Sequence, residues 1–245
     1  MKKSLLTSVC VLALAGAAFA QGTLNWNTMS PVGITVQINN SLSPLAGGTP
    51  SVSGTYMGTA AGSFYFELLY NTMFTGSQIA APSAADLLVG GSWIDSGLEA
   101  KNATASAGKI VPVVANIQAV PLGTWAGGIG ALGGTTNNIV LVGWSSNLGT
   151  TWSAALDTLA NWNASIGESV YFGVSTTGYI VPNIAPATGA SLFSSAAGVN
   201  GLPINSVNMQ LYLVPMEGLP TPEPGTMALM GLGGFALWML RRRKT

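Results

Sequence analysis

Ile139-Val140-Leu141-Val142-Gly143-Trp144 is an unbroken apolar run in the middle of the chain. A strand with one face in water alternates apolar and polar residues, whereas a strand covered on both faces has no polar side. The run is therefore predicted to be a central β-strand that is buried on both faces. Other elements are expected to pack against each face of its sheet.

Residues 63–70 form the second strong strand candidate. Alternate positions divide this segment into two faces, with Phe64, Phe66, Leu68 and Tyr70 on one and Tyr65, Glu67 and Leu69 on the other. Shorter segments are separated by Gly, Pro, Ser and Asn residues, which favour turns. These further strand candidates are residues 23–27, 34–39, 51–57, 93–99, 109–120, 169–176 and 209–214. The first two are expected in an antiparallel sheet, and glycine-rich residues 123–136 and 178–202 are expected to be long connections.

One helix is predicted, over residues 150–161. Thr150 or Thr151 can cap its first turn, because a threonine oxygen accepts a bond from a free backbone N–H. Its apolar residues recur at helical spacing and place one face against the sheet: Trp152, Leu156 and Leu159. A shorter helical turn is expected within residues 80–88.

These elements predict an all-β fold. Roughly seven to ten short strands with one short helix are typical of a β-sandwich, for which the jelly roll is one topology. No strict internal repeat is visible, which argues against a solenoid or propeller. The predicted sandwich domain spans residues 21–217, and a single hydrophobic helix is expected near the C-terminus.

The first 20 residues have the three parts of a secretory signal peptide. Lys2 and Lys3 precede an apolar segment, and Ala18-Phe19-Ala20 provides the small residues of a cleavage site. Signal peptidase is expected to act at Ala18 and Ala20, leaving Gln21 as the first mature residue. The only cysteine, Cys10, lies within the signal, so the mature protein is predicted to contain no disulfide.

The last part of the chain has the plan of a membrane-held tail. A linker at residues 218–225 contains Pro222-Glu223-Pro224, and an uncharged apolar segment follows at residues 226–240. As a helix, the apolar segment would rise about 23 Å, which is short of a ~30 Å hydrocarbon core. The chain then closes with a basic cytoplasmic tail, residues 241–245, whose membrane-stop cations are Arg241, Arg242, Arg243 and Lys244.

Together these tail features resemble the PEP-CTERM sorting signal of exported proteins in Gram-negative bacteria. The matching residues are the motif Pro222, Glu223 and Pro224, the apolar segment, and the basic end. The resemblance implies that an exosortase, a membrane-embedded enzyme of cysteine transpeptidase type, is a partner. It also implies cleavage near the motif, followed by release or transfer to the cell surface.

The distribution of charge excludes one class of partner. Outside the two terminal signals, residues 21–224 contain two lysines, Lys101 and Lys109, against eight acidic residues, so their formal charge is −6. Such a body has no basic surface for nucleic acid. Because charged residues are rare, the surface must be built mainly from neutral hydroxyl and amide side chains, which suits a secreted matrix or surface protein.

The side-chain inventory also limits the chemistry. The chain has no histidine, and the predicted mature chain has no cysteine. Histidine- or cysteine-based catalysis, zinc sites, haem ligation and iron–sulfur clusters are therefore not expected. The prediction is a protein without catalytic residues, metal or cofactor.

A carboxylate pair is the enzymatic alternative, as in glycoside hydrolysis. Glu67 and Glu168 are its best candidates, although Glu67 is more simply read as a solvated strand residue. Asp95 and Glu99 could supply oxygen ligands for calcium, but the full loop pattern is missing and Asp95 is expected to cap a turn.

Tryptophans could supply stacking platforms for sugars. Trp26, Trp144 and Trp152 lie in patterned strands or the helix and are expected in the core. Trp93, Trp125 and Trp162 lie nearer to loops and are expected to be exposed, and Trp93 and Trp125 are the predicted glycan contacts.

The sequence predicts an exported surface or extracellular-matrix protein with a structural or adhesive role. It would be held in the inner membrane by its C-terminal helix before processing and would then move to the surface or matrix, where extracellular polysaccharide is a candidate partner. A carbohydrate-binding module and a carboxylate-dependent glycosidase are the two alternatives.

Overall fold

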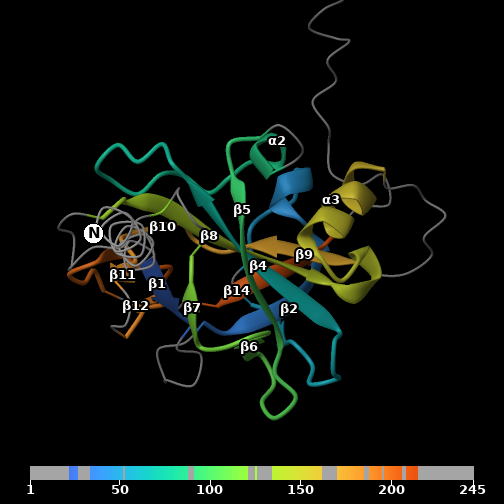
Figure 1. Ribbon diagram of the computed structural model, residues 1–245. Helices are drawn as coiled ribbons and strands as arrows, with labels where there is room; N and C mark the ends of the chain where they lie inside the picture. The colour runs from blue at the N-terminus through green and yellow to red at the C-terminus, as the bar shows by residue number, and fades with distance from the viewer. Residues whose placement is uncertain are drawn as a thin grey trace, which may run out of the picture.

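The computed structural model describes residues 22–26, 34–51, 53–87, 91–120, 125, 134–161, 170–184, 188–194, 196–205 and 208–214. These residues form mostly β-structure with few helices, so the prediction of an all-β fold is confirmed (Figure 1). The helical elements are short: η1 (Pro44–Ala46), α2 (Ala84–Leu87), η2 (Ser146–Leu148) and α3 (Trp152–Ala160).

A ten-stranded sheet forms the centre of the molecule. Along its main path the order is β3 (Thr55–Tyr56), β2 (Val36–Leu42), β14 (Met209–Leu213), β9 (Tyr171–Val174), β8 (Asn137–Ser145), β4 (Phe64–Asn71), β5 (Ile94–Asn102) and β6 (Ile110–Pro112). Off this path, β10 (Gly178–Ile180) pairs with β8 and with β13 (Gly201–Leu202). The last described strand, β14, therefore lies inside the sheet between β2 and β9.

A second sheet of four strands is built around β1 (Gly22–Asn25). Its other strands are β7 (Ile117–Ala119), β11 (Asn183–Ile184) and β12 (Ala190–Ser191). The short strands β10 to β13 fall within residues 178–202, where the sequence predicted only a long connection, so that prediction was wrong. The predicted loop at 123–136 lies mainly outside the described residues.

Two strand pairs run parallel, which differs from the antiparallel arrangement expected for the first strands. β1 pairs parallel with β12, and β2 pairs parallel with β14. Parallel neighbours require long connections, and both of these pairs join the beginning of the chain to segments far along it. Alternation within one strand carries no information on the direction of its neighbour, which is why the sequence did not show this.

The central strand β8 is buried along its whole length, as predicted. Its alternate residues enter two separate hydrophobic clusters, with Ile139 and Leu141 in one and Val140, Val142 and Trp144 in the other. We call the sheet face toward β1 the inner face and the face toward α3 the outer face. Figure 1 shows the β1 sheet and α3 on opposite sides of the large sheet.

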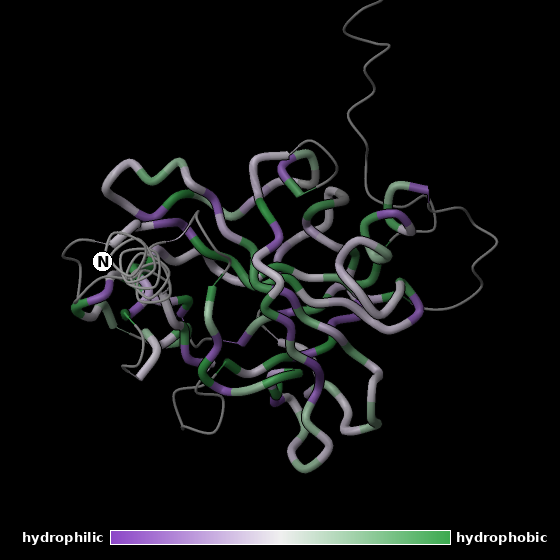
Figure 2. The backbone as a smooth tube through the Cα atoms, in the orientation of Figure 1, coloured by the Kyte–Doolittle hydropathy of each residue, from purple (hydrophilic) through white to green (hydrophobic). Residues whose placement is uncertain are grey.

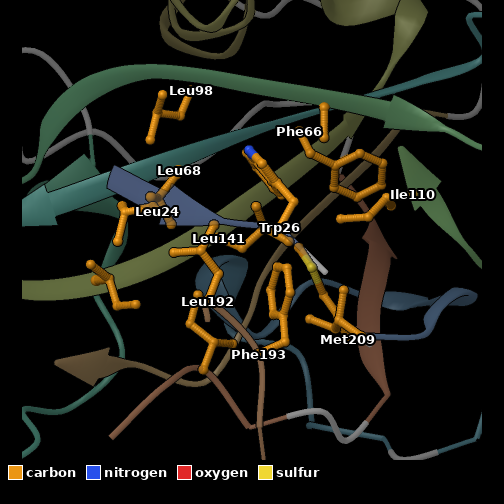
Figure 3. Close-up of a cluster of buried hydrophobic side chains, with 14 of the residues drawn as sticks. Leu24, Trp26, Phe66, Leu68, Leu98, Ile110, Leu141, Leu192, Phe193 and Met209 are labelled. Atoms are coloured by element: carbon orange, nitrogen blue, oxygen red, sulfur yellow. The ribbon is translucent and has the colours of Figure 1, made fainter. Parts of the chain in front are cut away.

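The inner cluster joins the two sheets. Leu24 and Trp26 from the β1 segment pack with Phe66 and Leu68 of β4 and with Leu141 of β8 (Figure 3). Beside them, the rings of Trp26 and Phe193 have centroids 6.1 Å apart. The two sheets therefore enclose one shared core, which is the arrangement that defines a sandwich.

The outer cluster joins the large sheet to α3. Trp152 of α3 lies between two aromatic rings of the sheet, 5.6 Å from Trp144 and 6.2 Å from Phe172 between ring centroids. The indole N–H of Trp144 donates to the Gly149 carbonyl at 2.8 Å and fixes the turn that leads into the helix. The helix thus covers one sheet face, as its pattern predicted.

Thr151 is the cap of α3, and its side-chain oxygen accepts from the Ala154 backbone N–H at 3.3 Å. Replacing Thr151 by alanine is expected to lower the free energy of unfolding by about 1 kcal/mol, because one free N–H of the first turn loses its partner. Thr150→Ala is the matched control, since Thr150 lies just outside the cap. Chemical denaturation should show a smaller loss for Thr150→Ala, and equal losses would contradict the capping role.

Candidate functional site

Several predicted site residues lie outside the part of the chain that the structure describes. They are the cleavage residues Ala18 and Ala20, Trp162, the alternative acid Glu168, the motif Pro222, Glu223 and Pro224, and the basic residues Arg241 to Lys244. The predicted tail helix 226–240 lies outside as well. Within the described residues, no helix is long and apolar enough to span a membrane.

The two predicted glycan contacts are core residues. The Trp125 side chain is 1% exposed and that of Trp93 is 9% exposed, so the expectation that they lie on the surface was wrong. Trp125 stacks on Tyr70 with ring centroids 5.2 Å apart and belongs to the inner cluster, while Trp93 belongs to the outer one. Neither ring presents an open face on which a sugar could stack.

Glu67 is buried, although a solvated strand residue was the simpler reading of the sequence. It lies on the outer face of β4, directly opposite Glu99 of β5 and Val142 of β8. Its residue exposure is 1%, and its Oε1 has no hydrogen-bond partner. Leu69 and Val142, which lie beside it on this face, are buried as well.

A β-bulge adds a third acid to the same face. The pairing of β4 with β5 shifts so that Leu68 is opposite Leu98 while Leu69 is opposite Asp95. The turn includes Gly97 at φ 66°, and its N–H donates to Asp95 Oδ1 at 2.7 Å. Asp95 therefore caps the turn, as expected from the sequence.

Burial raises the pKa of Glu67 from its usual 4.5 to about 10, and the neighbouring Asp95 and Glu99 carboxyl groups add to the rise. At neutral pH the Glu67 side chain therefore carries its proton. A protonated carboxyl can act as a general acid, but it must reach the leaving oxygen of its substrate. Glu67 is enclosed, so its geometry gives the glycosidase alternative no support.

The three acids also do not make a metal centre. Over the described ranges, no group of three His, Cys, Asp or Glu side chains is placed to hold a metal ion.

A groove with both polar and apolar lining lies elsewhere on the outer face, beside the last described strand. It has a volume of about 590 Å³ and lies between β14, the end of β9 and the segment at Pro50 and Ser51. Its lining within the described residues consists of Pro50, Ser51, Val174, Ser175, Thr176, Asn208, Met209, Gln210 and Tyr212. This size is in the range of ligand sites in proteins.

Alternation along β14 explains why this strand contributes polar side chains to the groove. Met209 and Leu211 enter the inner cluster, so Gln210 and Tyr212 project to the outer face. Gln210 Nε2 donates to Oε1 of Gln37 on the parallel neighbour β2 at 2.7 Å. The outer face is thus apolar under α3 and polar at the β2–β14 pair.

The overlying segment is held to the sheet by side chains. The Tyr212 hydroxyl donates to the Ser51 carbonyl at 2.8 Å and accepts from the Ser51 N–H at 2.9 Å. Asn39 Nδ2 donates to the Ser53 carbonyl at 3.0 Å. At Gly54 a Cβ atom would lie 2.5 Å from the Ile38 carbonyl oxygen, so only glycine allows this close approach. The groove is therefore formed in advance of any ligand.

Comparison with protein families gives one match. Residues 220–244 match the PEP-CTERM protein-sorting motif. Neither the curated proteins nor the solved structures include a match to this chain. The motif begins six residues after Val214, whose N–H donates to the Val170 carbonyl at 2.9 Å at the end of the described fold.

Proposed function

We propose that this chain, a PEP-CTERM domain-containing protein that is exported and sorted by an exosortase, is a non-catalytic structural or adhesive component of the cell surface or extracellular matrix. The observation that carries the proposal is the sorting motif at residues 220–244, together with the signal peptide predicted at residues 1–20. Export places the body outside the cytoplasm, where it can serve as a structural component or mediate adhesion.

The body supports a role that depends on packing and surface chemistry. Its strands enclose two apolar clusters, and charged residues are rare in its sequence. Figure 2 shows that hydrophobic and hydrophilic residues are interspersed along the backbone. Hydroxyl and amide groups donate and accept hydrogen bonds without creating a strong field. Such a surface suits dense contact with hydrated polymers and with other copies of matrix proteins.

Deleting residues 220–245 is expected to abolish sorting, because it removes the whole signal that an exosortase would read. Glu223→Ala should impair the same step by changing the centre of the motif. Cell fractionation with mass spectrometry of the mature C-terminus measures both location and cleavage. Glu217→Ala is the matched control, since it removes an acid outside the matched motif. Unchanged maturation and location of the deletion variant would refute the proposal.

A carbohydrate-binding role is the second candidate function. The buried positions of Trp93 and Trp125 remove its original basis. The groove beside β14 favours a carbohydrate-binding role through residues other than these two tryptophans.

A further inference from the structure

The groove beside β14 combines neutral polar groups with apolar patches. Its described lining contains hydroxyl groups from serine, threonine and tyrosine, and side-chain amides from Asn208 and Gln210. Val174 and Pro50 add apolar surface. None of these lining residues carries a charge. The groove therefore offers hydrogen bonds and apolar contact without attracting ions of either sign.

Two polar groups at the groove have fixed orientations. The Ser175 hydroxyl accepts from the Leu141 N–H at 2.9 Å and donates to the Thr176 carbonyl at 2.7 Å. Gln210 uses its Nε2 on Gln37, and its Oε1 has no hydrogen-bond partner. The fixed groups lower the cost of ordering on binding.

We propose that this groove binds an uncharged oligosaccharide or a segment of an uncharged polysaccharide. Sugar rings present hydroxyl groups at their edges and C–H groups on their faces, and the groove matches both kinds of surface. An anionic glycan would lose part of its hydration on entering the groove and would find no cationic side chain to pair with. No lysine or arginine lines the groove in the described part of the chain. The inference rests on the proposed surface or matrix role, in which polysaccharide is the surrounding material.

Isothermal titration calorimetry of the purified full chain tests the proposal. The probes are neutral hexasaccharides of glucose, xylose and mannose, with hexagalacturonate as the anionic comparison. The protein is kept in a polyoxyethylene detergent, because a detergent with a sugar head group would compete for the groove. At least one neutral probe is expected to bind, and hexagalacturonate is expected to bind more weakly.

Thr176→Arg should weaken binding of that neutral probe by about tenfold or more, which corresponds to about 1.4 kcal/mol. Thr176 is exposed and lines the groove, so a long side chain there blocks entry without disturbing the core. Thr104→Arg is the matched control, because it places the same residue at an exposed threonine outside the groove. Asn208→Ala, at a second exposed lining position, should also weaken binding if the groove is the site.

Three results would overturn the proposal: no neutral probe binds the wild-type chain, hexagalacturonate binds more tightly than every neutral probe, or Thr176→Arg binds like Thr104→Arg. Circular dichroism melting of each variant confirms that the fold is intact. The binding assay does not depend on sorting. If the chain is sorted normally but binds no glycan, only the glycan-binding proposal is refuted. If the chain binds glycan but its location and maturation do not change when the tail is deleted, only the sorting proposal is refuted.

Discussion

Replacing Phe66 by alanine is expected to lower the free energy of unfolding by about 3–5 kcal/mol. The Phe66 side chain is fully buried on the inner face of β4, within the cluster that joins the two sheets. Its removal leaves a cavity between elements that cannot easily move together, because both sheets are fixed by hydrogen bonds on either side. Urea denaturation followed by circular dichroism gives the free energy directly.

Gly143 tests the packing around this ring. It lies directly opposite Phe66 in the pairing of β4 with β8, and a Cβ atom there would be 2.5 Å from the ring. Gly143→Ala alone is expected to cost about 1–3 kcal/mol by overpacking. In the Phe66→Ala background the same substitution should cost less, because the new methyl group enters the space that the ring has left.

Tyr56→Ala is the control for loss of an aromatic ring, because Tyr56 is 60% exposed. Its effect should stay within about 0.5 kcal/mol. A Phe66→Ala loss as small as that of Tyr56→Ala would show that the inner cluster is not packed as described. Additive effects of Phe66→Ala and Gly143→Ala would show that the two residues are not in contact.

Replacing Glu67 by glutamine is expected to stabilise the protein by about 3 kcal/mol at pH 7. Burial raises the pKa of Glu67 to about 10, so the folded protein holds a proton that the unfolded chain releases above pH 4.5. Each pH unit in this window costs about 1.4 kcal/mol of stability. Glutamine has nearly the same shape and no such cost, because it remains neutral.

Because the pKa of Glu67 is raised on folding, its effect on stability is confined to a defined pH range. Below about pH 4.5 both states bind the proton, so the carboxyl group causes no pH-dependent loss. Between pH 4.5 and about pH 10 only the folded state keeps it, and the stability of the wild-type chain falls as pH rises. Glu67→Gln should therefore match the wild type near pH 4 and exceed it increasingly toward pH 9.

Asp157→Asn is the control, because it makes the corresponding acid-to-amide change at an exposed position on α3. Free energies of unfolding measured at pH 4, 7 and 9 give the pH dependence of stability for the wild type and for each variant. Equal slopes for Glu67→Gln and the wild type would contradict the buried, protonated carboxyl. Glycoside hydrolysis by the wild type that is lost in Glu67→Gln would instead favour the glycosidase alternative.

The sequence was most informative where burial is expressed by consecutive residues. The apolar run at 139–144 predicted a strand covered on both faces, and both faces of β8 are covered. The spacing of Trp152 and Leu159 likewise predicted the face of α3, and both side chains are buried. The sorting motif could be identified for a related reason, since its residues are adjacent in the chain.

Features that depend on distant segments could not be predicted. Trp125 lies in a glycine-rich stretch that resembles a loop, but its ring is buried against Tyr70. The sequence does contain an indication that Glu67 is buried, because Tyr65 and Leu69 make the rest of that strand face apolar. The groove had none, since its lining comes from three distant parts of the chain. The antiparallel pairing of β9 with β14 and the hydrogen bonds of Tyr212 to Ser51 bring them together.

The position of β14 has a mechanical consequence for a protein sorted through its tail. β14 ends at Leu213, and the sorting motif begins at residue 220, so tension on the tail reaches the fold through this strand. The strand is paired along its length with β2 and also with β9. Tension along its axis loads those backbone hydrogen bonds in shear, so several must break together, whereas a strand peeled from a sheet edge loses them one at a time. The rate of forced unfolding, rather than equilibrium stability, would then set how long the domain withstands a pull on its tail.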